Sequence, residues 1–140
     1  SRPAMQVELA ADLPLVSGDT AKLRQVIHNL LQNAERAVSE VPMPRIVVRT
    51  ETIDAGVKLT MRDNGSGFPE ALIGRAFEPY VTTKARGAGL GLAIVKKIVE
   101  EHNGTIAVAN DPSGGASVTI ILPSARAEVA EMRINKQAGR

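Results

Sequence analysis

The sequence predicts an α/β (α+β) sandwich of two layers, with a mixed sheet of about five strands covered on one face by three helices. Two long segments have apolar residues at helical spacing, and two pairs of β-branched runs are joined by tight turns. Helices and hairpins alternate along the chain, which favours helices packed on a sheet. The 140 residues, 44% of them hydrophobic, are enough for one buried core.

The first third of the chain predicts a short strand over Gln6–Leu9 and a long helix over Thr20–Ser39, with Asp19 as N-cap. Pro42 and Pro44 prevent the helix from continuing. Its apolar residues form one buried stripe, made of Leu23, Val26, Ile27, Leu30, Leu31, Ala34, Ala37 and Val38.

Two hairpins are predicted, one on each side of a second helical region. Their strands are expected over Arg45–Ile53 with Val57–Arg62, and over Thr105–Ala109 with Ser117–Leu122. Between them we expect a short helix at Pro69–Ala76, a basic, glycine-containing loop at Tyr80–Ala88 and a helix at Leu90–Glu101 that Asn103-Gly104 ends. Residues 1–123 are predicted to form one domain, and residues 124–140 a polar tail or frayed helix.

Composition excludes several classes of protein. Only Phe68, Phe77 and Tyr80 are aromatic, so a reader of single-stranded nucleic acid, which needs stacking platforms, is disfavoured. The net charge of +2 gives no broad basic face, and the absence of cysteine excludes disulfides and thiolate metal sites. Because no apolar run approaches the roughly 18–20 residues of a membrane span, we expect a cytoplasmic fragment without direct membrane contact.

The first long helix carries a polar strip beside its apolar stripe. Asn29, Asn33 and Arg36 lie at positions i, i+4 and i+7 and therefore share one side. Such a strip is often just a solvated face. The alternative is a site in which amide oxygens bind Mg²⁺ and a guanidinium binds phosphate.

Two glycine-rich segments predict ligand contacts. In Asp63-Asn64-Gly65-Ser66-Gly67, the carboxylate can accept a hydrogen bond from an exocyclic amine, and the glycines allow close backbone approach; a simple turn is the alternative. Gly87 to Leu92 opens a helix, whose free N–H groups suit phosphate. It is not a dinucleotide fingerprint, because Leu92 replaces the third glycine, and no Walker Gly-Lys-Ser/Thr follows.

Taken in order, these segments resemble the conserved boxes of bacterial sensor histidine kinases. Asn29 to Ala34 is similar to the N box, Asp63 to Gly67 to the G1 box, and Gly87 to Leu92 to the G2 box. Phe77-Glu78-Pro79-Tyr80 with Thr82-Thr83-Lys84 resembles the F box, and the resemblance covers residues 5–123. The run from Glu78 to Gly104 is similar to the nitrogen-regulation branch, NtrY-like or NtrB-like.

The resemblance implies the Bergerat fold of the GHKL group and binding of ATP with Mg²⁺. It makes Asn33 the metal ligand, places Asn29 and Arg36 at the phosphates, and gives the adenine amine to Asp63. Gly65 and Gly67 would admit the base. The remaining nucleotide contacts that it implies are Thr83, Lys84, Gly87, Gly89, Leu90 and Gly91.

The resemblance further implies transfer of the γ-phosphoryl group to a histidine on a dimerisation domain of the same protein, outside this chain, and then to a response regulator receiver domain. The parent can be anchored in the inner membrane, and the fragment itself is expected to be monomeric.

Neither histidine here has the context of an acceptor. His28 is expected to be structural or a minor phosphate-side contact, and His102 a C-terminal helix cation or a solvated side chain.

Two departures and two rival functions accompany this interpretation. Ala116 and Val118 stand where the family often has threonine and an aromatic residue, which puts one water-mediated adenine contact in doubt. A GHKL-type ATPase is one rival, but it would place a glutamate base where this chain has Asn29. A nucleotide-binding pseudo-kinase is the other, and the complete set of boxes argues against it.

Overall fold

The computed structural model describes residues 2–80 and 91–138, with side chains described as far as Arg133. Apart from Tyr80, the predicted loop over Tyr80–Ala88 lies outside the described residues. Within these ranges the elements are β1 (Ala4–Glu8), α1 (Thr20–Ala37), β2 (Arg45–Ile53), β3 (Gly56–Asp63), α2 (Glu70–Ile73), α3 (Gly91–Glu101), β4 (Thr105–Asn110), β5 (Ala116–Pro123) and α4 (Ala125–Ala138).

The strands form one mixed sheet in the order β1-β2-β3-β5-β4. β1 runs parallel to β2, and the other three pairs are antiparallel. The two predicted hairpins are β2–β3 and β4–β5, and they join through β3 and β5, with Asp63 opposite Ala116. The predicted mixed five-stranded sheet is thus confirmed.

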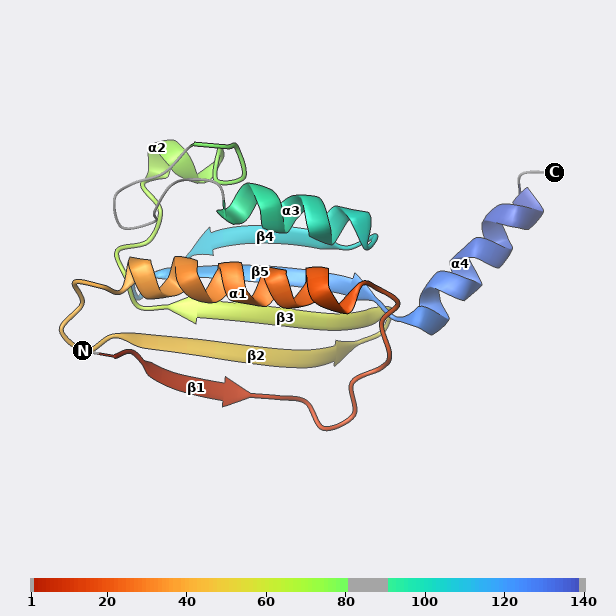
Figure 1. Cartoon of the computed structure of the whole chain (residues 1–140), viewed down its shortest axis with the longest axis horizontal. Coiled ribbons are helices and arrows are strands. Elements are labelled where there is room, and N and C mark those ends of the chain that lie inside the picture. Colours follow the sequence, from red (N-terminus) through yellow and green to blue (C-terminus); the bar gives the residue numbers. More distant parts are fainter. Residues whose placement is uncertain (1, 81–90, 139–140) are drawn as a thin grey trace.

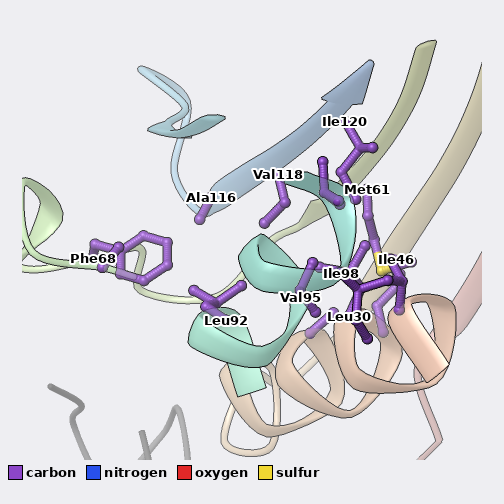
Figure 2. Close-up of a cluster of buried hydrophobic side chains, with 14 of the residues drawn as sticks. Leu30, Ile46, Met61, Phe68, Leu92, Val95, Ile98, Ala116, Val118 and Ile120 are labelled. Atoms are coloured by element: carbon purple, nitrogen blue, oxygen red, sulfur yellow. The ribbon is translucent and has the colours of Figure 1, made fainter. Parts of the chain in front are cut away.

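One face of the sheet is covered by α1 and α3, which lie side by side (Figure 1). Because side chains alternate along a strand, Ile46, Met61, Val118 and Ile120 all point to this face and are buried. They pack with helix residues such as Leu30 in a single core cluster (Figure 2). Each large aliphatic side chain removed from water contributes about 1.5–3 kcal/mol, so the helix–sheet contact is a large stabilising contribution.

The long helix α1 begins where the sequence predicts. The Asp19 side chain accepts hydrogen bonds from the N–H groups of Ala21 and Lys22, and so caps the helix. The helix ends at Ala37, two residues before the predicted end, because the chain then turns toward Pro42 and Pro44. Among the described residues, no helix has the length and hydropathy required to cross a bilayer.

The segment after Pro123 forms α4, which projects away from the sheet (Figure 1). Of the two expectations for this segment, the helix is the one observed, and it continues to Ala138. The buried Ser124 explains its start, since its hydroxyl accepts a hydrogen bond from the Ala127 N–H at 3.0 Å. Because Ser124 itself donates its N–H to the Ala55 carbonyl at 2.9 Å, the first turn is fixed to the hairpin β2–β3.

Candidate functional site

Three segments that are distant in sequence meet at one end of the sandwich. The C-terminal end of α1, the end of β3 and the start of α3 all lie at the left of Figure 1. α1 and α3 run in opposite directions, since the start of α1 contacts the end of α3 through Asp19 and His102. The turn after β3 packs on the last turn of α1, because a Cβ on Gly65 would lie 2.3 Å from the Ala37 carbonyl oxygen.

The three residues of the polar strip on α1 differ in how much of their surface is exposed. Asn33 is buried, with 9% of its surface exposed, whereas Asn29 is half-buried and Arg36 is exposed. Among the described residues, no hydrogen bond to the Asn33 side chain is found. Buried amides in native proteins nearly always have partners, and those without one often serve a ligand. No described residue occupies the Asn33 oxygen, which is the kind of oxygen that a hard cation or its bound water prefers, and the Mg²⁺ ligand stays a prediction.

Asp63, the predicted ligand of the base, is the last residue of β3 and is followed by a turn. Asp63 is half-buried, and its Oδ1 accepts a hydrogen bond from the Gly65 N–H at 3.0 Å. Gly67 has a φ of 77°, which side chains disfavour. Ala116, the departure noted above, is buried opposite Asp63. Protein contacts therefore already account for both glycines, and close approach to a ligand remains a prediction for them.

Two asparagines that we did not predict as functional hold this turn. The Asn64 side chain accepts from the Arg45 N–H and donates to the Met43 carbonyl, both at 2.8 Å. The Asn110 side chain bonds both backbone groups of Phe68. Because these partners lie about 20 to 40 residues away in sequence, no local pattern could have shown them.

The start of α3 supplies the third part of the site. Gly91 is its first residue, and a Cβ there would meet no described atom within 4 Å, so the space beside this helix end is open on the described side. Helix starts present unpaired N–H groups and a partial positive charge, which suit phosphate. The other predicted contacts in this part of the sequence, Thr83, Lys84, Gly87, Gly89 and Leu90, lie outside the described residues.

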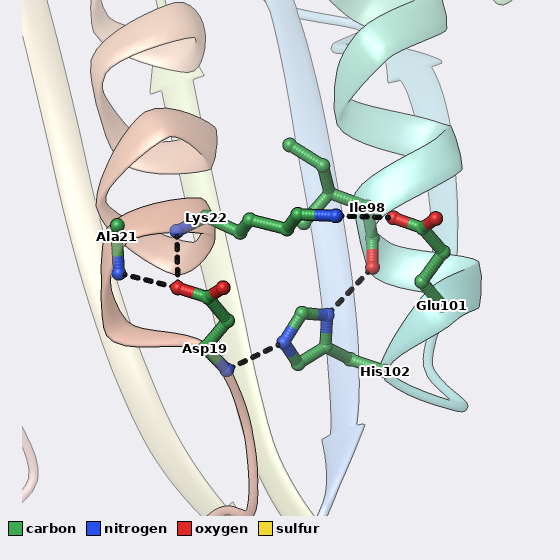
Figure 3. A network of polar contacts seen from close by, with 6 residues as sticks. All are labelled: Asp19, Ala21, Lys22, Ile98, Glu101 and His102. Carbon is green, nitrogen blue, oxygen red and sulfur yellow. Dashed lines mark hydrogen bonds and ion pairs between the residues drawn. The ribbon is translucent and has the colours of Figure 1, made fainter.

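The prediction for His102 is wrong in both of its forms. The side chain is buried, with 8% exposed, and its Nε2 accepts a hydrogen bond from the Asp19 N–H at 3.0 Å (Figure 3). Its Nδ1 lies 2.8 Å from the Ile98 carbonyl oxygen and must donate to it. The ring is therefore neutral, with its proton on Nδ1.

A loop from another part of the chain explains this error. A Cβ on Gly18 would lie 2.4 Å from the His102 ring, so the segment before α1 covers the histidine. The residues at the end of α3 do not show that the segment around Gly18 packs on the histidine ring. His28, for which a structural role was the first expectation, is exposed instead.

Comparison with protein families gives one match that covers most of the chain. Residues 18–126 match the family described as histidine kinase-, DNA gyrase B- and HSP90-like ATPases. The match includes the polar strip, the turn after Asp63 and the start of α3.

Curated relatives carry the names of sensor kinases. A putative sensor histidine kinase NtrY-like of Rickettsia bellii is 48% identical over 102 residues, which are 73% of this chain and 17% of that protein. Sensor histidine kinase ZraS of Escherichia coli is 42% identical over 111 residues, covering 79% of this chain and 23% of that protein. The chain thus spans about a fifth of the length of the relatives that it matches.

Solved structures with a similar fold are also named as histidine kinases. A mycobacterial sensor histidine kinase MprB superposes with a TM-score of 0.74 and 34% identity, covering 86% of this chain and 80% of that one. The catalytic domain of histidine kinase ThkA superposes with a TM-score of 0.75 and 32% identity over the same shares.

Proposed function

The chain belongs to the family of histidine kinase-, DNA gyrase B- and HSP90-like ATPases, as an ATP-binding catalytic domain of the histidine kinase type, and we propose that it binds ATP with Mg²⁺ and transfers the γ-phosphoryl group to a histidine on a separate domain. That domain is the histidine-containing dimerisation domain of the same parent protein. The second partner is the receiver domain of a response regulator. The domain works in the cytoplasm, on a parent that can be anchored in the inner membrane.

The proposal assigns a role to each part of the site. Asp63 accepts a hydrogen bond from the adenine amine, with Gly65 and Gly67 beside the base. Asn33 provides the oxygen for Mg²⁺, while Asn29 and Arg36 contact phosphate oxygens or water bound to the metal. The triphosphate is held by a group from the later part of the chain, namely Thr83, Lys84, Gly87, Gly89, Leu90 and Gly91.

One observation carries the proposal beyond family membership, and it is the buried side-chain amide of Asn33. No described residue bonds this amide, and burying an amide without a partner costs roughly 1–3 kcal/mol. An oxygen ligand to Mg²⁺ explains why it is kept. When bound there, the cation would neutralise charge on the triphosphate.

The chemistry needs little else from this chain. Phosphoryl transfer depends mainly on positioning and on charge stabilisation, and an amide at position 29 cannot act as the base that activates water. We therefore expect negligible ATP hydrolysis by the chain alone. Neither histidine of this chain is assigned as the acceptor, because His102 is buried and hydrogen-bonded and His28 lacks the sequence context of an acceptor.

The test is to mix this chain with a separately made histidine-containing dimerisation domain and γ-labelled ATP. Label on the histidine of the added domain, dependent on Mg²⁺, is the expected result. Tight binding of ATP without labelled histidine would contradict transfer and favour a nucleotide-binding module. A magnesium-dependent release of phosphate that Asn29→Ala abolishes would favour an ATPase instead.

A further inference from the structure

The hairpin turn between β4 and β5 is bonded to the turn that follows Asp63. The Asn110 Oδ1 accepts a hydrogen bond from the Phe68 N–H at 2.7 Å, and its Nδ2 donates to the Phe68 carbonyl at 2.8 Å. One side-chain amide therefore satisfies both backbone groups of Phe68, as a neighbouring strand would. The Phe68 ring itself is buried in the core beside Leu92 (Figure 2).

The same hairpin supports the other end of the turn. Asp63, Ala116 and Asn110 form one row across β3, β5 and β4. Gly115 has a φ of 88°, and a Cβ there would lie 1.9 Å from the Asp63 carbonyl oxygen. The segment from Asp63 to Phe68 thus rests on the hairpin at its first residue and at its last.

The hairpin turn is itself held by several internal hydrogen bonds. The Asp111 carboxylate accepts hydrogen bonds from the hydroxyl and the N–H of Ser113, at 2.7 and 2.9 Å. These bonds, with a smaller contribution from the Arg62 cation, hold the pKa of Asp111 below its ordinary value. The turn closes with the Asp111 N–H on the Gly115 carbonyl at 2.9 Å. A hairpin turn fixed by these bonds can hold the Asp63–Phe68 segment in one position.

The carboxylate of Asp63 is coupled to this support through the turn. Its Oδ1 accepts from the Gly65 N–H, so the orientation of the carboxylate depends on where the turn runs. Gly67 lies against Asn110, since a Cβ on Gly67 would be 2.8 Å from the Asn110 Oδ1. The amide of Asn110 can approach the turn only because residue 67 is glycine.

We propose that Asn110 is a positioning residue for the nucleotide base: it holds the Asp63–Phe68 turn so that the Asp63 carboxylate is fixed before ATP arrives. The inference rests on the proposed function, in which Asp63 binds the adenine amine. Without the Asn110 amide, the turn has more freedom, and binding has to order it first, which weakens affinity. Asn110 lies in none of the conserved boxes that the sequence resembles.

The experiment measures the affinity of Asn110→Ala for a non-hydrolysable ATP analogue and for ADP, each with Mg²⁺, by calorimetry on the whole chain. We expect both affinities to fall by the same factor, about three- to tenfold, the order of the net contribution of one neutral hydrogen bond. The factor is shared because the turn acts on the base end and not on the γ-phosphate. Thr50→Val is the matched control, since it removes another side-chain bond to backbone, from Ala10, toward the opposite end of β2.

A structural role without positioning predicts a different pattern. Asn110→Ala would then lower the urea midpoint while leaving affinity equal to that of Thr50→Val, and this result would overturn the inference. Asn110→Ser, whose single hydroxyl cannot serve both Phe68 groups, replaces the alanine variant if that variant does not fold. Asp63→Ala is measured in parallel: unchanged affinity there would refute the base contact itself, and the role of Asn110 with it.

Discussion

The two ends of the helix pair α1–α3 are built on opposite principles. At one end, polar groups of both helices are paired with each other: His102 bonds Asp19 and Ile98, and Lys22 lies 3.4 Å from Glu101 (Figure 3). At the other end, Asn33 is buried without a hydrogen bond to any described residue, and the neighbouring turn contains a glycine with positive φ. The first end stabilises the domain, and the second is the end where the proposed function places the ligand.

This contrast predicts which substitutions affect stability and which affect chemistry. Groups at the paired end should matter for unfolding and not for nucleotide. Groups at the open end should show the reverse. Four substitutions test that division, and the largest expected effect comes first.

Asn33→Ala should reduce phosphoryl transfer to an added dimerisation domain by at least about 100-fold, or about 2.7 kcal/mol in the barrier, because the metal oxygen is lost. The free energy of unfolding should stay equal or rise, since the substitution removes a buried amide that bonds none of the described residues. Gln32→Ala, which changes an exposed amide on the same helix, is the control. Transfer at the wild-type rate would exclude Asn33 as the metal ligand.

His102→Ala should destabilise the domain by about 2–4 kcal/mol, because a buried ring and two hydrogen bonds are lost and the Asp19 N–H loses its acceptor. Urea denaturation measures this change, and the affinity of the folded protein for the ATP analogue should not move. His28→Ala, at the exposed histidine, should change stability by less than about 0.5 kcal/mol. Equal effects of the two substitutions would show that the buried bridge is not a stabilising feature.

Asp63→Ala should weaken binding of the ATP analogue by about 1–3 kcal/mol, the cost of leaving the adenine amine unpaired. Calorimetry measures it, with Asp54→Ala in the exposed turn between β2 and β3 as control. If both variants bound as tightly as the wild type, the base would not lie at this carboxylate.

Lys22→Ala should change the free energy of unfolding by less than about 1 kcal/mol, because its ion pair with Glu101 is exposed, at 49% and 44% of the two side chains. The difference from wild type should vanish in high salt. A larger, salt-independent loss would contradict the view that this exposed ion pair contributes little to the stability of the paired end.

The sequence predicted most of the fold because its signals are local. Asp19 caps α1 as its position suggests, and the alternating runs around Asp54 form the expected hairpin. Helix and strand periodicities depend only on residues a few positions apart. The sequence left open whether the segment after Pro123 is a tail or a helix, because its cap, Ser124, is fixed by a bond to Ala55, far away in the sequence.

The site was predicted only in part, for the same reason. The order of the motifs identified Asn33 and Asp63 as candidate site residues. No local pattern shows that Asn110 bonds Phe68 or that Gly18 packs against His102. Neutral buried histidines and bridging asparagines are defined by tertiary contacts, which a single sequence does not display. For the same reason, the sequence did not show the protein contacts of Gly65 and Gly67, and their approach to a ligand stays a prediction.

The central claim is that the end of α1, the turn after β3 and the start of α3 form one nucleotide site. A crystal structure of this chain with a non-hydrolysable ATP analogue and Mg²⁺ tests it most directly. We expect the adenine amine within hydrogen-bond distance of the Asp63 carboxylate, the metal bound by the Asn33 oxygen, and the phosphates near Gly91. A nucleotide bound elsewhere, or a metal held without Asn33, would contradict the account.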